Sequence, residues 1–401
     1  MSTTTSSPSH CLDTPTLDRE SPALLHSISE HGGYAYVSMA ALAAGGDVRA
    51  AEAAREMAWE QLHSGPWHSV LPVWRDAYSM ACLHVARLHY ASGDFREALR
   101  VLDLGIIMGG TLLREDLDSA IEKVAEQTRR GGVRVSDLGN CEHRRLVDRE
   151  FNVAEVLQLL PMKSLSSEFV VKKSGLSLEK FLRDHYLSGS PVIISDCMAH
   201  WPAKMKWNDE DYLLSVAGDR TVPVEVGKNY LCTEWKQELI TFSEFLQRIK
   251  TDGTSPGGPT YLAQHPLFDQ VVGKKYIRLY SSSFSEELFP HSGTMLSNSS
   301  QVISFLNCMI EQLVLSTCVF AWKHKTITAS HLSGQRILEV DLDNIDEVKF
   351  PKVQDLEFVD CILEEGEMLY IPPKWWHYVR SLTTSFSVSF WWSEGERSDT
   401  S

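Results

Sequence analysis

The sequence lacks the features that would place it in an oxidising compartment. Its eight cysteines are scattered, with no CxxC pair, which argues against both a disulfide framework and a zinc module. The N-terminal stretch is polar and has no apolar core of the kind found in secretory signal peptides. We therefore expect residues 1–20 to form a disordered leader, and residence in the nucleus, or also in the cytoplasm, follows by default.

An excess of basic residues and an uninterrupted apolar span are also missing. The formal net charge is -15 at pH 7, which argues against nucleic-acid binding through a basic face and suits a basic protein partner better. The apolar stretch 302–320 carries Asn307, Glu311 and Gln312 in its middle, so it is a poor membrane span. At 401 residues the chain has room for two domains.

Residues 21–130 show helical periodicity. We expect helices over about 47–64, 74–90, 95–108 and 112–128, each closed by a glycine-containing or polar turn. The segment HVARLHYASGDFREALRVLDLGI resembles one tetratricopeptide-like hairpin, although a solenoid needs about three repeats to bury its core. The domain is therefore either an interaction module or a structural cap on the second domain. Residues 131–168 are charged and glycine-bearing, which is typical of a linker.

From about residue 169 the pattern changes to short strands. We expect strands over 191–195, 221–226 and 261–268, with helices over 176–184 and 241–250 between them. Near the C-terminus, strands are expected over 368–371, 376–382 and 385–391. Pro372-Pro373 ends the first of these, because proline fixes φ and cannot donate to a ladder. His377 follows this turn among aromatic residues, where it is either a packed core residue or a metal ligand.

The stretch GEMLYIPPKWWHYV resembles the end of the jumonji-C domain. PVIISDCMAHWPA, TVPVEVG, YLAQHPLFDQ and KKYIRLY extend the likeness over most of the chain from residue 169, especially to the plant proteins that are similar to jumonji-C domain-containing protein 5. The resemblance implies a cupin-type double-stranded β-helix over 169–395 with a short tail at 396–401. The expected fold is thus α+β, with the helical, tetratricopeptide-like domain first.

The same resemblance implies an Fe(II)- and 2-oxoglutarate-dependent histone lysine demethylase or protein hydroxylase. It further implies a nuclear role in chromatin and circadian gene regulation, with a histone or other basic protein as substrate. His377 matches the last of the family's three iron ligands, Lys275 the lysine that pairs with the 2-oxoglutarate carboxylate, and Tyr261 a tyrosine that hydrogen-bonds it. Without the resemblance, Lys275 would be a solvent-facing lysine and Tyr261 a core aromatic.

The chain departs from the family where the other iron ligands should lie. Such enzymes take a histidine and a carboxylate from one H-x-D or H-x-E motif, yet none of the fifteen histidines is followed two residues later by Asp or Glu. Gln270 runs directly into Val271, where the family has that motif and at least two strands. The spacing from His265 to Asp269 is too long to replace it.

These departures predict an incomplete barrel with unpaired strand edges and weak or no iron binding. An atypical insert occupies residues 302–340, and the missing and extra segments together suggest an alternatively spliced or mis-predicted product. Three interpretations stay open: an oxygenase by descent, a non-catalytic interaction or scaffold protein, and a binding module for a small acid through Lys275.

Overall fold

The computed structural model describes most of the helical region and the greater part of the strand region. The described residues are 11–66, 69–131, 160–161, 163–165, 168–201, 206–207, 209–227, 236–250, 260–265, 275–285, 288, 318–322, 326–328, 345, 348, 352–373, 375–382 and 385–389. Most of the expected linker 131–168, the start of the leader and the tail 396–401 lie outside these residues.

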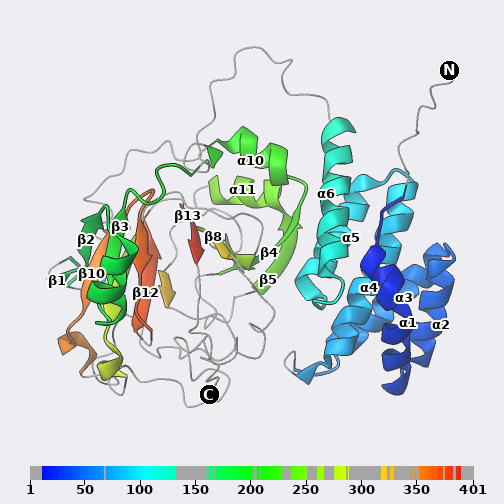
Figure 1. Cartoon of the computed structure of the whole chain (residues 1–401), viewed down its shortest axis with the longest axis horizontal. Helices are drawn as coiled ribbons and strands as arrows, with labels where there is room; N and C mark the ends of the chain where they lie inside the picture. Colours follow the sequence, from blue (N-terminus) through cyan, green and yellow to red (C-terminus); the bar gives the residue numbers. More distant parts are fainter. Residues whose placement is uncertain are drawn as a thin grey trace, which may run out of the picture. The chain divides into compact units, whose positions relative to one another are not determined.

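The chain divides into two compact units. The first comprises residues 1–141 together with two short later segments, 217–222 and 239–243, and the second comprises the remainder. Within the described residues, six helices make up most of the first unit and strands dominate the second (Figure 1). The α+β expectation is confirmed.

Helices that pack against their neighbours along the chain build the first unit. They are α1 (Pro15–Glu30), α2 (Tyr34–Ala44), α3 (Val48–Leu62), α4 (Pro72–Ala91), α5 (Phe95–Met108) and α6 (Arg114–Gly131). The helices expected over 47–64, 74–90, 95–108 and 112–128 are confirmed to within a few residues. Asp47 and Asp94 cap α3 and α5, because their carboxylates accept from the backbone N–H groups of Ala50 and Glu97 at 3.0 and 3.2 Å.

Helix α1 corrects the expected leader 1–20. The helix begins at Pro15, and proline suits the first turn because that turn leaves its N–H groups without partners inside the helix. Leu17, Leu24 and Ile28 of α1 are buried, so this segment belongs to the helical core. The polar composition of the first residues concealed the buried apolar positions, which begin at Leu12.

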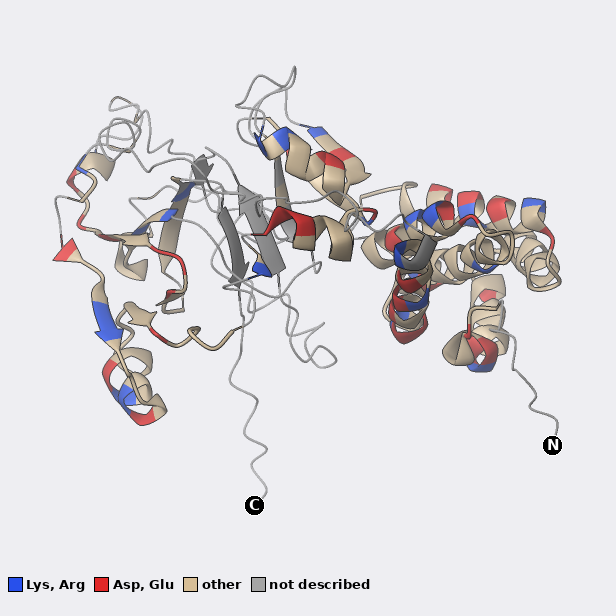
Figure 2. Cartoon of the chain, turned by 90° about the horizontal axis from the view of Figure 1, so that it is seen from above, with Lys and Arg blue, Asp and Glu red and all other residues tan. Residues whose placement is uncertain are grey.

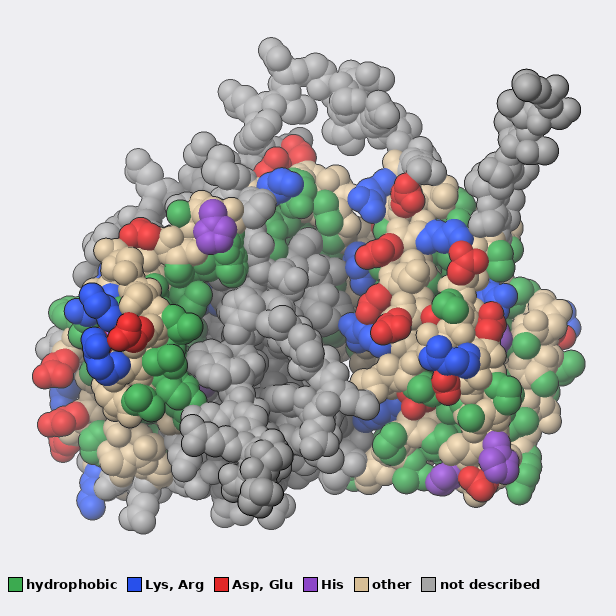
Figure 3. Space-filling model, viewed as in Figure 1, with side chains coloured by type: hydrophobic (Ala, Val, Ile, Leu, Met, Phe, Trp, Pro, Cys, Tyr) green, Lys and Arg blue, Asp and Glu red, His purple; other side chains and the backbone are tan. Residues whose placement is uncertain are grey.

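The helical core depends on close approach of α4, α5 and α6. A Cβ atom added at Gly105 of α5 would lie 2.9 Å from Leu117 Cδ2 and 3.1 Å from Cys82 Cβ. The glycine therefore lets three helices meet where a side chain would separate them. Acidic and basic side chains are interspersed over the surface of the helical unit in the views of Figures 2 and 3.

The described strands form three sheets. Their orders are β1-β10-β7-β12-β9, β11-β3-β2 and β13-β8-β6-β4-β5. The strands are β1 (Glu168–Phe169), β2 (Val171–Ser174), β3 (Val192–Ser195), β4 (Thr221–Val226), β5 (Lys236–Thr241), β6 (Thr260–His265), β7 (Lys275–Tyr280), β8 (Cys318–Trp322), β9 (Thr326–Thr328), β10 (Val359–Leu363), β11 (Met368–Tyr370), β12 (Trp376–Ser381) and β13 (Ser385–Ser389).

Short helices connect the strands. They are α8 (Leu178–Phe181), the π-helix η3 (Leu182–Tyr186), α10 (Glu210–Ala217), α11 (Phe242–Lys250) and the 3-10 turns η4 (Ser282–Phe284) and η6 (Val353–Asp355). The helix expected over 176–184 is thus an α-helical turn that continues as a π-helix. Among the described residues, no helix has the length and apolar character needed to cross a membrane.

The insert 302–340 contributes two strands that occupy sheet positions. Strand β8 lies between β6 and β13, and β9 pairs with β12 over Thr326–Thr328. The expectation of unpaired edges is wrong for β6 and β12, because the insert supplies a neighbour to each. The physical reason is that any extended segment can satisfy the N–H and C=O groups of an open edge, whatever its side chains.

Candidate cosubstrate and metal site

His377 and Lys275 lie on adjacent strands of the same sheet. Strands β7 and β12 run antiparallel, with His377 opposite Leu279 and Ser381 opposite Lys275. Residues opposite one another point to the same face, as do alternate residues along one strand. His377 and Lys275 therefore share a face and are separated by four residues, about 13 Å, along the strand direction.

The sequence before His377 fixes the entry into β12. Strand β11 ends at Tyr370, Pro372-Pro373 follows, and the Trp375 N–H donates to the Pro372 carbonyl at 3.3 Å. Burial lowers the pKa of His377, opposed by a hydrogen bond with the Trp375 backbone. The imidazole is therefore neutral at pH 7, which is the form that can bind a metal ion.

Lys275 is a buried cation at the start of β7. Its side chain is only 7% exposed, and burial lowers the pKa of the amine from 10.5 to about 7. The apolar side of the sheet explains the shift, because Ile277 and Leu279 on the same face pack in a hydrophobic cluster. An anionic carboxylate beside the amine would favour its charged form, so Lys275 fits one end of a dicarboxylate such as 2-oxoglutarate.

Tyr261, the other expected cosubstrate residue, lies in a different sheet. It is in β6, and its backbone pairs with Glu225 of β4. Its side chain is outside the described residues, so a hydrogen bond from Tyr261 to the cosubstrate stays a prediction.

An iron site requires ligands beside His377, and the neighbouring strands do not provide them. Strand β12 lies between β7 and β9, whose sequences KYIRLY and TIT contain no His, Asp or Glu. Within the described part of the chain, no group of three or more His, Cys, Asp and Glu residues is placed to hold a metal ion. The described residues around His377 do not make up the two-histidine and one-carboxylate set of a non-haem iron centre.

The opposite face of the same sheet holds a buried polar network that the sequence analysis missed. Tyr276 Oη donates to Asp360 Oδ2 at 2.7 Å, and Arg278 Nε donates to Tyr276 Oη at 2.9 Å. Asp360 also accepts from the Leu165 N–H at 2.7 Å, while Arg278 Nη2 donates to Ser164 Oγ at 2.8 Å. The network ties residues 164–165 to the sheet. Its one signal in the sequence is the alternation of polar and apolar residues in KYIRLY.

Models of known protein families match both the helical region and the strand region. Residues 14–138 match a family described as KDM8-like, N-terminal ARM repeats, so the helical hairpin belongs to armadillo-type rather than tetratricopeptide-type repeats. A cupin-like domain matches residues 178–270 and 263–398. These two pieces meet where the sequence analysis locates the missing H-x-D segment.

Curated relatives cover nearly the whole chain. Lysine-specific demethylase JMJ30 of Arabidopsis thaliana is 52% identical, over 97% of this chain and 96% of its own length. Lysine-specific demethylase 8 of Xenopus tropicalis is 31% identical, over 84% of this chain and 87% of its own length. Jumonji C domain-containing protein 5 of Drosophila melanogaster is 30% identical, over 88% of this chain and 90% of its own length. The alignment with the Arabidopsis protein spans 451 positions, more than the 401 residues here, so it includes positions that this chain lacks.

Proposed function

The chain belongs to the jumonji-C family of cupin-like proteins, and from that premise we propose that it is a member without iron-dependent catalysis that acts by binding. The strand environment of His377 carries the proposal. Strands β7 and β9 flank β12, and neither contains a His, Asp or Glu that could complete the two-histidine and one-carboxylate set. A single imidazole cannot hold Fe(II) against water and competing ligands.

The proposed partner is a histone or another basic protein in the nucleus. Two of the relatives bear the name lysine-specific demethylase, and the net charge of -15 suits a basic partner. The ARM-repeat region is the proposed binding surface, since stacked helical repeats commonly present extended binding faces. Participation in circadian gene control belongs to the same proposal.

The ancestral cosubstrate site is proposed to bind a small dicarboxylic acid still, but without turnover. Lys275 supports it, because a lysine with a pKa of about 7 on the inner face of a sheet is unfavourable for stability alone and typical of a binding position. The ligand class is a 2-oxo dicarboxylate such as 2-oxoglutarate, with one carboxylate at the amine.

A second candidate is the ancestral oxygenase activity. It is favoured by one specific observation, the placement of His377 and Lys275 on one face of adjacent strands. When bound, Fe(II) would supply the oxidative chemistry. This candidate needs two further iron ligands from residues outside those described.

Two measurements on the full chain separate the candidates. The first is iron content after anaerobic incubation with Fe(II) and desalting. The second is succinate release with 2-oxoglutarate and a methylated histone peptide, with the Arabidopsis relative as a positive control. We expect less than stoichiometric iron and no succinate above the level of His377→Ala. One equivalent of iron, with turnover that His377→Ala abolishes, would establish the oxygenase instead.

A further inference from the structure

Helix α5 of the helical unit contains a fully buried carboxylate. Asp103 has an exposed fraction of 0% and lies between Leu102 and Leu104 in an apolar run. A buried carboxylate is costly unless hydrogen-bonded and paired with an opposite charge. Its partners therefore show what this part of α5 is built to hold.

Both carboxylate oxygens of Asp103 are occupied by residues far along the chain. Arg220 Nε donates to Oδ1 at 2.7 Å, and the Thr221 N–H donates to Oδ2 at 2.6 Å. Arg220 is itself largely buried, with its side chain 19% exposed. Each oxygen thus already accepts a hydrogen bond from within the chain.

Thr221 is the first residue of β4, and the segment around it is held from two sides. The Phe242 N–H donates to the Arg220 carbonyl at 2.8 Å, and the Ser243 N–H donates to the Gly218 carbonyl at 3.0 Å. Segments 217–222 and 239–243 belong to the same compact unit as the six helices. Beyond Thr221, β4 continues to Val226 and pairs with β6.

We propose that Asp103 makes the helical repeats an intramolecular support for the start of β4, so that this part of α5 is an occupied docking face and not a surface for other proteins. The carboxylate accepts from the Thr221 N–H and neutralises Arg220. The two interpretations of the helical region, an interaction module and a structural cap, then apply to different parts of it. Around Asp103 the helices serve as a structural support, and binding of other proteins falls to other faces of the unit.

Hydrogen exchange of the full chain, followed by mass spectrometry, tests this proposal. We expect Asp103→Ala to speed exchange of peptides covering 217–226 on the order of 100-fold, because a broken buried pair leaves an unpaired cation and an unpaired N–H. Peptides from α1–α3 should change little. Asp118→Ala is the matched control, since Asp118 is an exposed α6 carboxylate paired with Arg114 at 3.2 Å, and it should leave 217–226 unchanged.

Arg220→Gln tests the same contact without altering the helices. It should also speed exchange of 217–226. The double variant with Asp103→Ala should show less than the sum of the two single effects, because both changes break one interaction. If Asp103→Ala loosens only the helices and leaves 217–226 protected, Asp103 is a residue of the helical core alone. Additive effects of the two changes would likewise overturn the proposal.

Discussion

The two units each bury a charged side chain, and the surroundings of the two charges differ. In the helical unit, burial raises the pKa of Asp103, while Arg220 and the Thr221 N–H oppose that shift from within the protein. In the strand region, burial lowers the pKa of Lys275 to about 7. Contacts within the chain thus oppose the pKa shift of Asp103, whereas burial is the cause of the lowered pKa of Lys275. Such perturbed pKa values cluster at binding positions.

Removing the cation beside Asp103 should give the largest effect on stability. Without Arg220, the folded-state pKa of Asp103 rises further above its unfolded value. A raised carboxyl pKa favours the fold at low pH and disfavours it as the pH rises. We expect Arg220→Gln to lower the free energy of unfolding by about 3 kcal/mol at pH 8 and by less at pH 5, measured by urea denaturation of the full chain. Equal losses at both pH values would contradict this account of Asp103.

Replacing Lys275 should change stability in the opposite direction. The folded-state pKa of Lys275 is about 7 and its ordinary value is 10.5, so the unfolded chain binds the proton more strongly and native stability rises with pH over this interval. Lys275→Met removes that cost, and we expect a gain of about 2 kcal/mol at pH 6. The gain should shrink as the pH approaches 10, which urea denaturation across this range would show. A loss of stability at pH 6 would mean that Lys275 is a structural residue like Asp103.

Binding of 2-oxoglutarate should depend on the same proton. The dicarboxylate prefers the charged amine, so its affinity is full below pH 7 and falls as the pH rises through the pKa of Lys275. We expect roughly tenfold weaker binding for each pH unit above 7 until the pKa in the complex is reached, measured by calorimetry without added metal. Lys275→Met should abolish binding, and His377→Ala should leave the pH midpoint unchanged. Binding that is independent of pH between 6 and 9 would remove Lys275 from the site.

The helical unit was the easier of the two regions to predict from sequence. Helices α3, α4 and α5 repeat their apolar residues every three to four positions and end at glycine or polar turns, so their bounds followed from local signals. Helix α1 was not predicted, because the residues of its first turns, PTLDRES, are mostly polar. The contact of Asp103 with Arg220 could not be predicted, because the residues are 117 positions apart and such pairing leaves no periodic trace.

The strand region shows the same limit more strongly. Strand β4 and the placement of His377 at the start of β12 were confirmed, since proline and alternation mark them locally. The pairing of β8 and β9 was not foreseen, because strand order depends on which edges are open and not on the sequence of the strand alone. For the same reason, the family resemblance identified Lys275 and His377 as candidate site residues but did not show which residues lie opposite them in the sheet.

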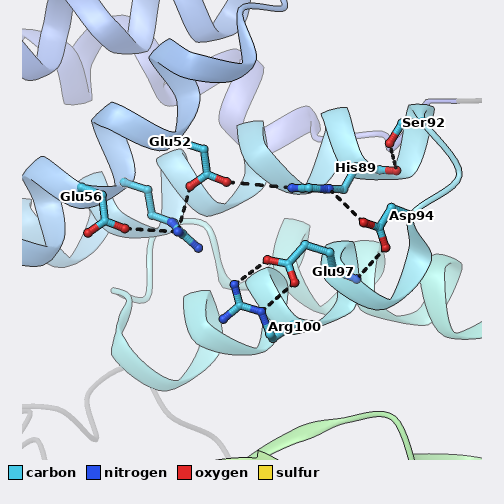
Figure 4. A network of polar contacts seen from close by, with 8 residues as sticks. Glu52, Glu56, His89, Ser92, Asp94, Glu97 and Arg100 are labelled. Carbon is cyan, nitrogen blue, oxygen red and sulfur yellow. Dashed lines mark hydrogen bonds and ion pairs between the residues drawn. The ribbon is translucent and has the colours of Figure 1, made fainter.

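Breaking an exposed charge pair should have the smallest effect on the free energy of unfolding. Figure 4 shows Glu97 and Arg100 of α5 joined by an ion pair, in which Arg100 Nε donates to Glu97 Oε2 at 2.8 Å. The pair links the same two charge types as Asp103 and Arg220, but the Arg100 side chain is 45% exposed, so water already stabilises both charges. We expect Glu97→Gln to change the free energy of unfolding by about 0.5 kcal/mol or less, and less still in 1 M salt. Urea denaturation of Glu97→Gln and of Arg220→Gln under the same conditions compares an exposed pair with a buried one. A loss in the free energy of unfolding as large for Glu97→Gln as for Arg220→Gln would show that burial does not determine the contribution of the two pairs.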